Sequence, residues 1–269
     1  MPMKEMPSKT FLGNISVSKA IDGGFVALTQ YSDKRIFEEW HCHENASISF
    51  LLNGVHEEDL LGKHYKRVPG DIKFIPAGEM HRCNAYAAST KKINLDLKHS
   101  LLHEMTLSED VLLERLLQNR QTKFTLLKLY HEIHDKNGYG QASLQLLLYE
   151  LFHPVNADLK SYSGKLPLWV LRLKEILNDE WDVRFDLQDL AHKAGVHPVT
   201  ISRYFPQYFS STLSSYLRSI RVEKSINLIK TTSLSLTEIA YTCGFADQAH
   251  FTRSFKMHTG FVPKDFRKI

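Results

Sequence analysis

Three histidines in two short stretches are the residues best suited to chemistry in this sequence of 269 residues. His41 and His43 lie in "HCHE", and His81 lies in "GDIKFIPAGEMHRCN". Alternate residues of a β-strand share a face, so His41 and His43 are expected to point inward together. Converging imidazoles bind a small ligand with hydroxyl or carboxylate groups. They also bind a divalent metal such as zinc, with water or Glu44 completing the site. The sequence predicts an effector site here, with a metal site as the alternative.

Two arginines in the C-terminal third suggest a different chemistry. Arg203 and Arg253 are 50 residues apart, within the similar segments "TISRYF" and "HFTRSF". Each lies between apolar residues with the spacing of a buried helix face, so each arginine is expected to point outward. Because arginine is a strong reader of guanine in DNA, this pair predicts contacts with bases.

The two segments belong to an internal repeat that predicts two helix-turn-helix motifs. The first copy is "DLQDLAHKAGVHPVTISRYF" and the second contains "EIAYTCGFADQAHFTRSF". Ser235 and Glu238 predict a capping box at the start of a short helix. Gly244 is expected to end that helix in a left-handed conformation, and Asp247 to cap the next helix. The equivalent positions of the first helices are Leu187, Leu190, Ala191 and Gly195 in one copy and Leu236, Ile239, Ala240 and Gly244 in the other.

One further helix, from about Leu213 to Lys230, is expected between the two copies. About 18 residues rising ~1.5 Å each give a length of ~27 Å. Such a helix suits two recognition helices that enter DNA about one helical turn, ~34 Å, apart.

The charge is distributed unevenly along the chain. From Lys165 to the end there are 15 Lys and Arg residues against 10 Asp and Glu, whereas residues 1–164 have 19 against 20. The basic excess of the C-terminal part is consistent with a polyanionic partner. The three cysteines, Cys42, Cys83 and Cys243, form no CxxC pair, which favours a reducing cytoplasm. Cys42 and Cys83 are expected to face away from the histidines as small buried residues.

The pattern of the chain predicts four parts. Residues 1–100 read as short strands bounded by Gly, Asn and Asp, and residues 101–153 have helical spacing. Residues 154–165 are rich in Pro, Gly and small polar residues and are expected to be a linker, and residues 166–269 read as helical. No apolar run is long enough for a membrane span, and the first residues lack the apolar region of a secretory signal.

The helical segment "QASLQLLLYELF" has apolar residues around nearly its whole circumference, which requires burial on all sides. It is expected to be a dimerisation element, and burial against the strand unit of its own chain is the alternative.

The C-terminal segment resembles the AraC/XylS family of transcription regulators. The signature "LTEIAYTCGFADQAHFTRSFKMHTGFVPKDFR" carries the resemblance, which covers about Leu166 to Ile269. It implies a monomeric DNA-binding unit whose two helix-turn-helix motifs enter successive major grooves. The base-facing residues it implies are Val199, Ser202 and Arg203 in the first motif and Gln248, Ala249, His250, Thr252 and Arg253 in the second. Lys256 and Arg218 are expected to bind phosphate and set the register.

The first motif departs from the family pattern at three positions. Ser210 stands where the family usually has Gly, Leu213 where it often has Pro, and Pro206 where a basic residue is common. Proline removes an amide donor and clashes one turn back, so this recognition helix is expected to end early or bend. The loss of a phosphate contact is expected to weaken binding by the first motif.

The histidine stretches resemble the two motifs of the cupin superfamily, carried by Gly54, Gly70, Pro76, Gly78 and His81. The glutamate usual in the first motif falls near Ser47 or Ile48, so one metal ligand of the superfamily is missing. The resemblance implies a barrel that senses a small molecule, because AraC-type regulators often carry such a domain. Trp40 and Phe50 are close to these stretches in sequence and could supply apolar or stacking surface. The sequence leaves open which face of the strand each side chain occupies.

These observations predict a multidomain α+β protein: a cupin-like β-barrel with a helical appendix, followed by an all-α domain with two helix-turn-helix motifs. The predicted function is a cytoplasmic transcription regulator that binds double-stranded DNA and responds to a small-molecule effector, a sugar being the commonest theme of the family. Homodimerisation is expected, as is contact with RNA polymerase if the protein is an activator, and neither membrane binding, a cofactor nor catalysis is expected. The alternatives are a metal-dependent cupin enzyme fused to a DNA-binding module, with His41, His43 and His81 as ligands, and an effector-independent architectural DNA binder.

Overall fold

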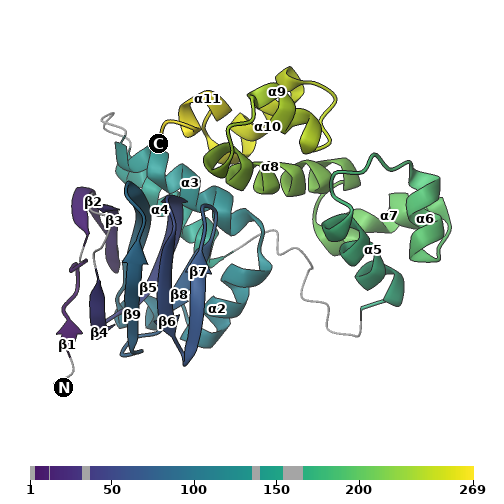
Figure 1. Ribbon diagram of the computed structural model, residues 1–269. Coiled ribbons are helices and arrows are strands. Elements are labelled where there is room, and N and C mark those ends of the chain that lie inside the picture. Colours follow the sequence, from purple (N-terminus) through teal and green to yellow (C-terminus); the bar gives the residue numbers. More distant parts are fainter. Residues whose placement is uncertain (1–3, 12, 32–36, 135–139, 154–165) are drawn as a thin grey trace. The chain divides into compact units, whose positions relative to one another are not determined.

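The computed structural model describes residues 4–11, 13–31, 37–134, 140–153 and 166–269. They form two compact units (Figure 1). The first unit comprises Met1–Leu117, Thr125–Phe152 and Ile269, and the second comprises Gln118–Phe124 and His153–Lys268. The predicted linker, residues 154–165, lies outside the described residues. Among the helices described, none is both long and apolar enough to cross a membrane.

The first unit contains two five-stranded sheets that enclose a common interior. One sheet has the order β1-β4-β9-β6-β7 and the other β2-β3-β10-β5-β8, so each sheet combines strands from distant parts of the sequence. The strands are β1 (Lys4–Met6), β2 (Asn14–Ile21), β3 (Gly24–Tyr31), β4 (Glu38–His43), β5 (Ala46–Asn53), β6 (His56–Leu60), β7 (Lys63–Arg67), β8 (Ile72–Ile75), β9 (His81–Tyr86) and β10 (Thr90–Leu97). This architecture confirms the predicted cupin-like strand domain.

Alternation along the strands decides which side chains enter this interior. In β6, for example, His56, Glu58 and Leu60 are buried while the residues between them are partly exposed. The central strands β5 and β10 are buried along most of their length, with Ile48, Phe50 and Ile93 fully covered. The interior therefore mixes an apolar core with polar side chains, and those polar groups form the site described below.

A helical segment follows the strands, as the sequence predicts, and four helices are described in it. They are α1 (His99–Glu104), α2 (Glu109–Gln118), α3 (Gln121–His134) and α4 (Gly140–Phe152). Within the single chain, helix α4 is buried along one side, and its burial on the other side by a second copy stays a prediction. Leu144, Leu148 and Phe152 are buried within the chain, and α4 packs on β2. Leu146 is 60% exposed and Tyr149 is 55% exposed. The chain's own fold therefore accounts for most of the apolar surface of α4.

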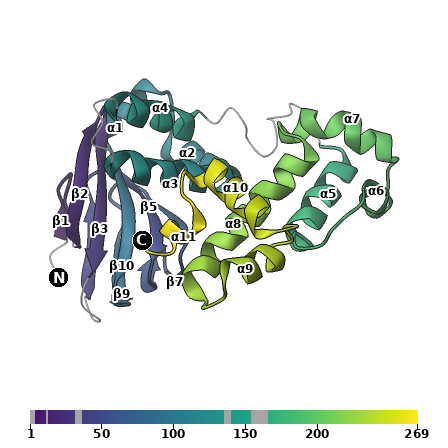
Figure 2. The same cartoon turned by 90° about the horizontal axis from the view of Figure 1, so that it is seen from above.

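The second unit is helical, as predicted. Its helices are α5 (Leu168–Asp179), α6 (Leu187–Ala194), α7 (Pro198–Phe209), α8 (Leu213–Thr231), α9 (Leu236–Thr242), α10 (Gln248–Thr259) and α11 (Pro263–Phe266). The pairs α6–α7 and α9–α10 are the two helix-turn-helix motifs, and α8 runs between them and packs against both α7 and α10 (Figure 2).

The local signals around the second motif act as the sequence predicts. Ser235 and Glu238 form a capping box at the start of α9, and the Asp247 carboxylate accepts a hydrogen bond from the His250 amide. Gly244 has φ of +72° and Gly195 has φ of +74°, so both turns use the left-handed conformation that glycine adopts without steric cost. The repeat in the sequence is therefore a repeat in the backbone.

Candidate DNA interface and effector site

The recognition helices α7 and α10 are each held by an apolar face. Phe205 and Phe209 on α7, and Phe251 and Phe255 on α10, are buried in the domain core. The Phe205 and Phe209 rings stack with their centroids 4.2 Å apart. Because one face of each helix is fixed in this way, the opposite face of each helix is left for a partner.

The predicted base-facing residues lie on these outer faces. Val199 is 61% exposed, and Ser202 and Arg203 are also exposed on α7. On α10 the exposed residues are Gln248, Ala249, Arg253 and Lys256, while His250 and Thr252 are partly covered. Arg218, on α8, is also partly exposed. The structure thus brings each predicted group together on one helix, and the contacts of these residues with DNA stay a prediction.

Two of the predicted base-facing residues on α10, Gln248 and His250, are oriented by neighbouring side chains. The Thr237 hydroxyl donates a hydrogen bond of 2.6 Å to Oε1 of Gln248. The His250 ring packs edge-on against Phe245, with centroids 5.4 Å apart. These contacts restrict the rotamers of both residues before any DNA binds. Sequence reasoning did not identify Thr237, because its relation to Gln248 depends on how α9 crosses α10.

Helix α7 does not end early at Pro206, and a bend at this residue, the other expected outcome, stays a prediction. The helix continues through Pro206 to Phe209 and has 12 residues, the same length as α10. Phe205 and Phe209 anchor the turns on both sides of Pro206 in the core, and Pro206 itself is exposed. Burial of these two rings therefore outweighs the cost of the missing amide donor.

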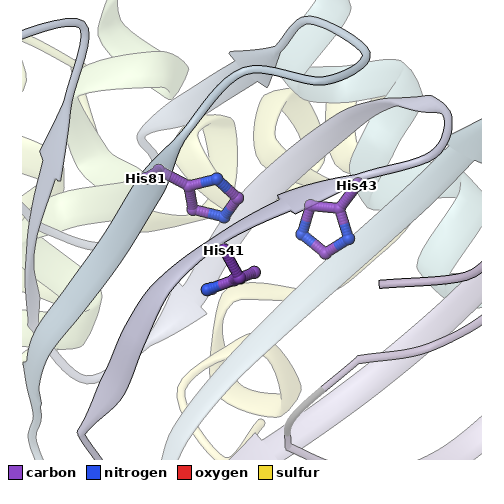
Figure 3. Close-up of side chains that lie close together, drawn as sticks. All are labelled: His41, His43 and His81. Carbon is purple, nitrogen blue, oxygen red and sulfur yellow. The ribbon is translucent and has the colours of Figure 1, made fainter. Parts of the chain in front are cut away.

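The three histidines do converge in the first unit (Figure 3). His41 pairs directly with His81 across the antiparallel strands β4 and β9, and His43 lies two residues further along β4. The ring centroids of His41 and His81 are 4.2 Å apart, and those of His43 and His81 are 5.1 Å apart. One ring nitrogen from each histidine lies within 4.8 Å of the others. Strand register thus produces the cluster that the sequence spacing suggests.

Backbone contacts determine which nitrogen of two of these rings carries the proton. Nδ1 of His41 lies 2.7 Å from the carbonyl oxygen of Glu39, and Nδ1 of His81 lies 3.2 Å from that of Glu79. A carbonyl oxygen only accepts hydrogen bonds, so Nδ1 is the protonated nitrogen in both rings. In the neutral rings, Nε2 therefore offers a lone pair.

Two of the three imidazoles, those of His43 and His81, are kept neutral by their surroundings. Burial, together with the charge of Lys73 and the neighbouring His41, lowers the pKa of His81 to about 2. Burial, His41 and Lys73 lower the pKa of His43 to about 4. At neutral pH these two imidazoles are uncharged hydrogen-bond acceptors and potential metal ligands.

The histidines line a cavity of about 40 Å³ between the two sheets. This space suits a few water molecules or a small group of a ligand. The other lining residues are Phe11, between β1 and β2, and from the two sheets Tyr31, Glu38, Ser47, Ser49, His56, Lys73, Ile75, Cys83, Lys92 and Asn94. The cavity wall is thus strongly polar for a β-sandwich interior.

Two buried lysines are the most unusual part of this wall. Lys73 forms an ion pair with Glu58, whose other oxygen accepts a hydrogen bond of 2.6 Å from Nε of Arg67. Lys92 donates to the hydroxyl of Tyr86 over 3.1 Å and lies above the rings of Tyr86 and Tyr31. Buried charges are stable only when paired in this way. The sequence signal for Lys92 is the alternation of Lys92 and Asn94 with apolar residues in "TKKINLDL".

Several expectations about neighbouring residues need correction. Cys83 lines the same cavity as the histidines, because it lies two residues from His81 on β9 and so shares its face. Trp40 is 44% exposed and Phe50 is fully buried, and neither lines the cavity. Glu44 is exposed and accepts a hydrogen bond from the Ser8 amide, so it does not complete a metal site. The acidic residue at the cavity is Glu38.

Comparison with known proteins agrees with both halves of this description. Residues 22–152 match the AraC-like ligand binding domain, and residues 190–269 match a helix-turn-helix domain family. The HTH-type transcriptional activator RhaR of Cronobacter sakazakii is 23% identical over 257 aligned residues, covering 87% of this chain and 88% of that protein. The RhaR activator of Yersinia pseudotuberculosis is 24% identical and covers 90% of this chain and 89% of its own length. The activator RhaS of Escherichia coli is 30% identical over 127 residues, which cover 46% of this chain and 44% of that protein.

Among solved structures, ToxT from Vibrio cholerae is 14% identical and covers 92% of this chain and 98% of its own, with a TM-score of 0.37. The two family matches fall mainly one in each compact unit, and the alignments with the two RhaR activators cover nearly the whole length of those proteins. The chain therefore belongs to the AraC family of DNA-binding transcription regulators and carries an effector-binding domain ahead of its two helix-turn-helix motifs.

Proposed function

We propose that the effector of this regulator binds at His41, His43 and His81 and that its binding changes how the chain engages DNA. The observation that carries the proposal is the convergence of the three rings on one cavity inside the ligand-binding domain. Converging polar groups in a mostly apolar domain are typical of small-molecule sites. Effector control requires different affinities for two conformations of the protein, and a ligand held between two sheets can supply that difference.

The chemistry of the cavity favours a ligand rich in hydroxyl groups. The Nε2 lone pairs of His41 and His81 accept hydrogen bonds from hydroxyls. The ammonium groups of Lys73 and Lys92 add positive charge that also suits a carboxylate. A sugar or a sugar acid has these groups, and the small volume of the cavity favours a ligand that inserts one end between the sheets.

On the DNA side, the exposed faces of α7 and α10 are proposed to read bases in successive major grooves. Arg203 and Arg253 are assigned to guanine, Gln248 to adenine, and Val199 and Ala249 to thymine methyl groups. The remaining base-facing residues proposed are Ser202, His250 and Thr252, and Lys256 and Arg218 are assigned to phosphate. The DNA-binding domain is proposed to comprise residues 166–269, after an effector domain of residues 1–100, a helical segment of residues 101–153 and a linker of residues 154–165.

Dimerisation through α4 is part of the proposal. Leu146 and Tyr149, three residues apart, are on the exposed side of this helix and provide apolar surface for a second copy. Sedimentation of the full chain tests this. The wild type is expected to be a dimer and Leu146→Glu a monomer, with Gln141→Glu on another face of α4 as the control. A monomeric wild type rejects the assignment.

The relatives named as activators support a role in activation, which would make RNA polymerase a partner. A regulator of chromosomal genes works in the cytoplasm, and no catalytic step is required for this role.

The effector assignment is tested by titrating neutral sugars and sugar acids into the full chain while following tryptophan fluorescence and DNA affinity. His43→Ala and His81→Ala are expected to abolish the response and leave ligand-free DNA binding nearly unchanged. His99→Ala, at an exposed position of α1, is the control. A normal response in both cavity variants means that these histidines do not hold the effector. Loss of folding of the first unit in both means that their role is structural.

A divalent metal at the three histidines, with or without a metal-dependent reaction, is the second candidate. The fixed tautomers of His41 and His81 favour it, because backbone carbonyls orient metal-ligating histidines in the same way. Lys73 and Lys92 oppose it by their charge. Metal analysis of protein purified without an affinity tag decides between the candidates. One equivalent of zinc or another transition metal, lost in His81→Ala, supports the metal site, and a metal-free protein that still responds to its effector supports the first candidate.

A further inference from the structure

Arg221 lies near the middle of α8, and its guanidinium donates hydrogen bonds to three backbone carbonyls. Nε donates to Trp181 over 3.0 Å, Nη2 donates to Val183 over 2.9 Å, and Nη1 donates to Gly244 over 2.8 Å. Trp181 and Val183 belong to the loop between α5 and α6, just ahead of the first helix-turn-helix motif. Gly244 lies in the turn of the second motif. One side chain therefore ties α8 to both motifs at once.

The same place is one of close backbone approach. A Cβ atom on Gly244 would lie 2.8 Å from the carbonyl oxygen of Asp182 and 3.0 Å from Cζ of Arg221. Such a contact with backbone is too short for a side chain, so the turn of the second motif rests directly against the loop of the first. Gly244 is thus required for two reasons, its positive φ and this approach.

Arginine is well suited to this position. Its planar guanidinium offers five donors in a fixed fork, so it can bond three carbonyls in fixed directions at the same time. The guanidinium makes no carboxylate ion pair among the residues that the structure describes. Its partners are instead the backbone of the two motifs, and their position relative to α8 is what these bonds restrict.

Apolar packing of α8 against α7 and α10 sets the separation of the motifs but tolerates small rotations. Directed hydrogen bonds to both motifs remove this freedom. We propose that Arg221 is a positioning residue that fixes the second recognition helix relative to the first. It thereby sets the distance, along the DNA, between the two clusters of bases that α7 and α10 contact. The inference rests on the proposed placement of α7 and α10 in DNA, but its geometric part can be tested without DNA.

The geometric test uses spin labels at Gln207→Cys and Met257→Cys in the full chain. These two positions are equivalent in the repeat and both are exposed, whereas Cys42, Cys83 and Cys243 are buried. Pulsed electron paramagnetic resonance is expected to give one narrow distance distribution for the wild type. Arg221→Lys, which keeps the charge and a long stem but not the fork, is expected to broaden or shift it. The matched control is Arg184→Lys, because Arg184 is exposed and its side chain makes no hydrogen bond or ion pair among the described residues.

The DNA test compares a selected site with the same site carrying one extra base pair between its two clusters. One base pair turns the second cluster by roughly 35°, given about 10–10.5 base pairs per turn. The wild type and Arg184→Lys are expected to lose at least about tenfold in affinity, comparable with one mismatched base pair. Arg221→Lys is expected to bind the original site more weakly and to lose less on insertion.

A narrow, unshifted label distance in Arg221→Lys overturns the proposal, whatever its DNA binding. Arg221→Lys can also give a broadened distance and still lose as much affinity as the wild type when one base pair is inserted. This outcome supports the positioning role of Arg221 and contradicts the placement of the helices in DNA. Should Arg221→Lys melt well below the wild type, the distance is measured on protein whose circular dichroism shows a folded helical unit. An unchanged distance in that protein also overturns the proposal.

Discussion

Ser210 and Gly260 occupy equivalent left-handed positions at the ends of the two recognition helices, with φ of 52° and 83°. Glycine adopts this conformation without steric cost. In serine the Cβ lies too close to the following carbonyl oxygen, which raises the free energy of the folded state. The Ser210 hydroxyl is buried without a hydrogen-bond partner among the described residues. The first motif therefore carries backbone strain that the second does not.

Replacing Ser210 with glycine is expected to stabilise the second unit by about 1–2 kcal/mol, the usual steric cost of this conformation. Thermal unfolding of the full chain, followed by circular dichroism, measures the change as a rise in the midpoint of the helical unit. The reciprocal change, Gly260→Ala, is expected to lower that midpoint. A lower midpoint for Ser210→Gly would show that the serine side chain contributes more than its conformation costs.

The hydrogen bond from Thr237 to Gln248 predicts a defined loss of specificity. Thr237→Val keeps the shape of the side chain and removes the donor, so Gln248 becomes free to rotate before it meets DNA. The expected cost is about 1 kcal/mol of affinity, the net worth of one hydrogen bond, at sites with the preferred base under Gln248. Sites changed at that base pair are expected to be affected less. Thr242→Val, also exposed on α9, is the control, and equal effects of Thr237→Val on both sites would contradict the orienting role.

The stability of the first unit is expected to fall with acid through His56. Burial lowers the pKa of His56 to about 4, while the unfolded chain binds this proton near pH 6.5. The contribution of His56 to stability is therefore complete above about pH 6.5 and is lost as the pH falls towards 4, at up to about 1.4 kcal/mol per pH unit. Urea unfolding at several pH values is expected to show a shallower dependence for His56→Gln than for the wild type, with His99→Gln as the surface control. An equal or steeper dependence in His56→Gln would contradict this account.

Lys256 is predicted to act on all DNA sequences alike. It is exposed on α10, and a single cation that neutralises one phosphate contributes about one unit to the dependence of affinity on salt. Lys256→Ala is expected to weaken specific and non-specific DNA by the same factor and to reduce the salt slope by about 1. Filter binding at several salt concentrations measures both quantities. A change of base preference would place Lys256 among the base contacts instead.

The DNA-binding half was largely predictable from the sequence because its signals are local. Ser235, Glu238, Gly244 and Asp247 each act within one turn of helix, and Gly195 repeats the signal of Gly244 in the first copy. Pro206 is the exception, because the outcome there depends on how deeply Phe205 and Phe209 are buried, which only the packed domain decides.

The effector half was predictable only in part. The histidines could be found because His41 and His43 share a strand and cupin-like motifs mark both stretches. Lys73, Lys92 and Glu38 could not be placed with them, because the pairing order of ten strands brings them to one cavity from distant parts of the chain. Cys83 is two residues from His81, so strand alternation places both side chains on the same face, which is the face that lines the cavity.

The central claim is that two recognition helices of one chain read two clusters of bases. Selection of binding sites from a random DNA pool by the full chain tests it most directly. Each chain of the wild type is expected to select two clusters of bases about 10–10.5 base pairs apart, so the proposed dimer selects two such pairs. Arg203→Ala and Arg253→Ala are each expected to relax the preference at one base pair, and the two base pairs lie in different clusters. Each change is expected to weaken specific binding by about 1–3 kcal/mol. A single selected cluster, or an Arg253→Ala protein with unchanged affinity and base preference, would contradict the account.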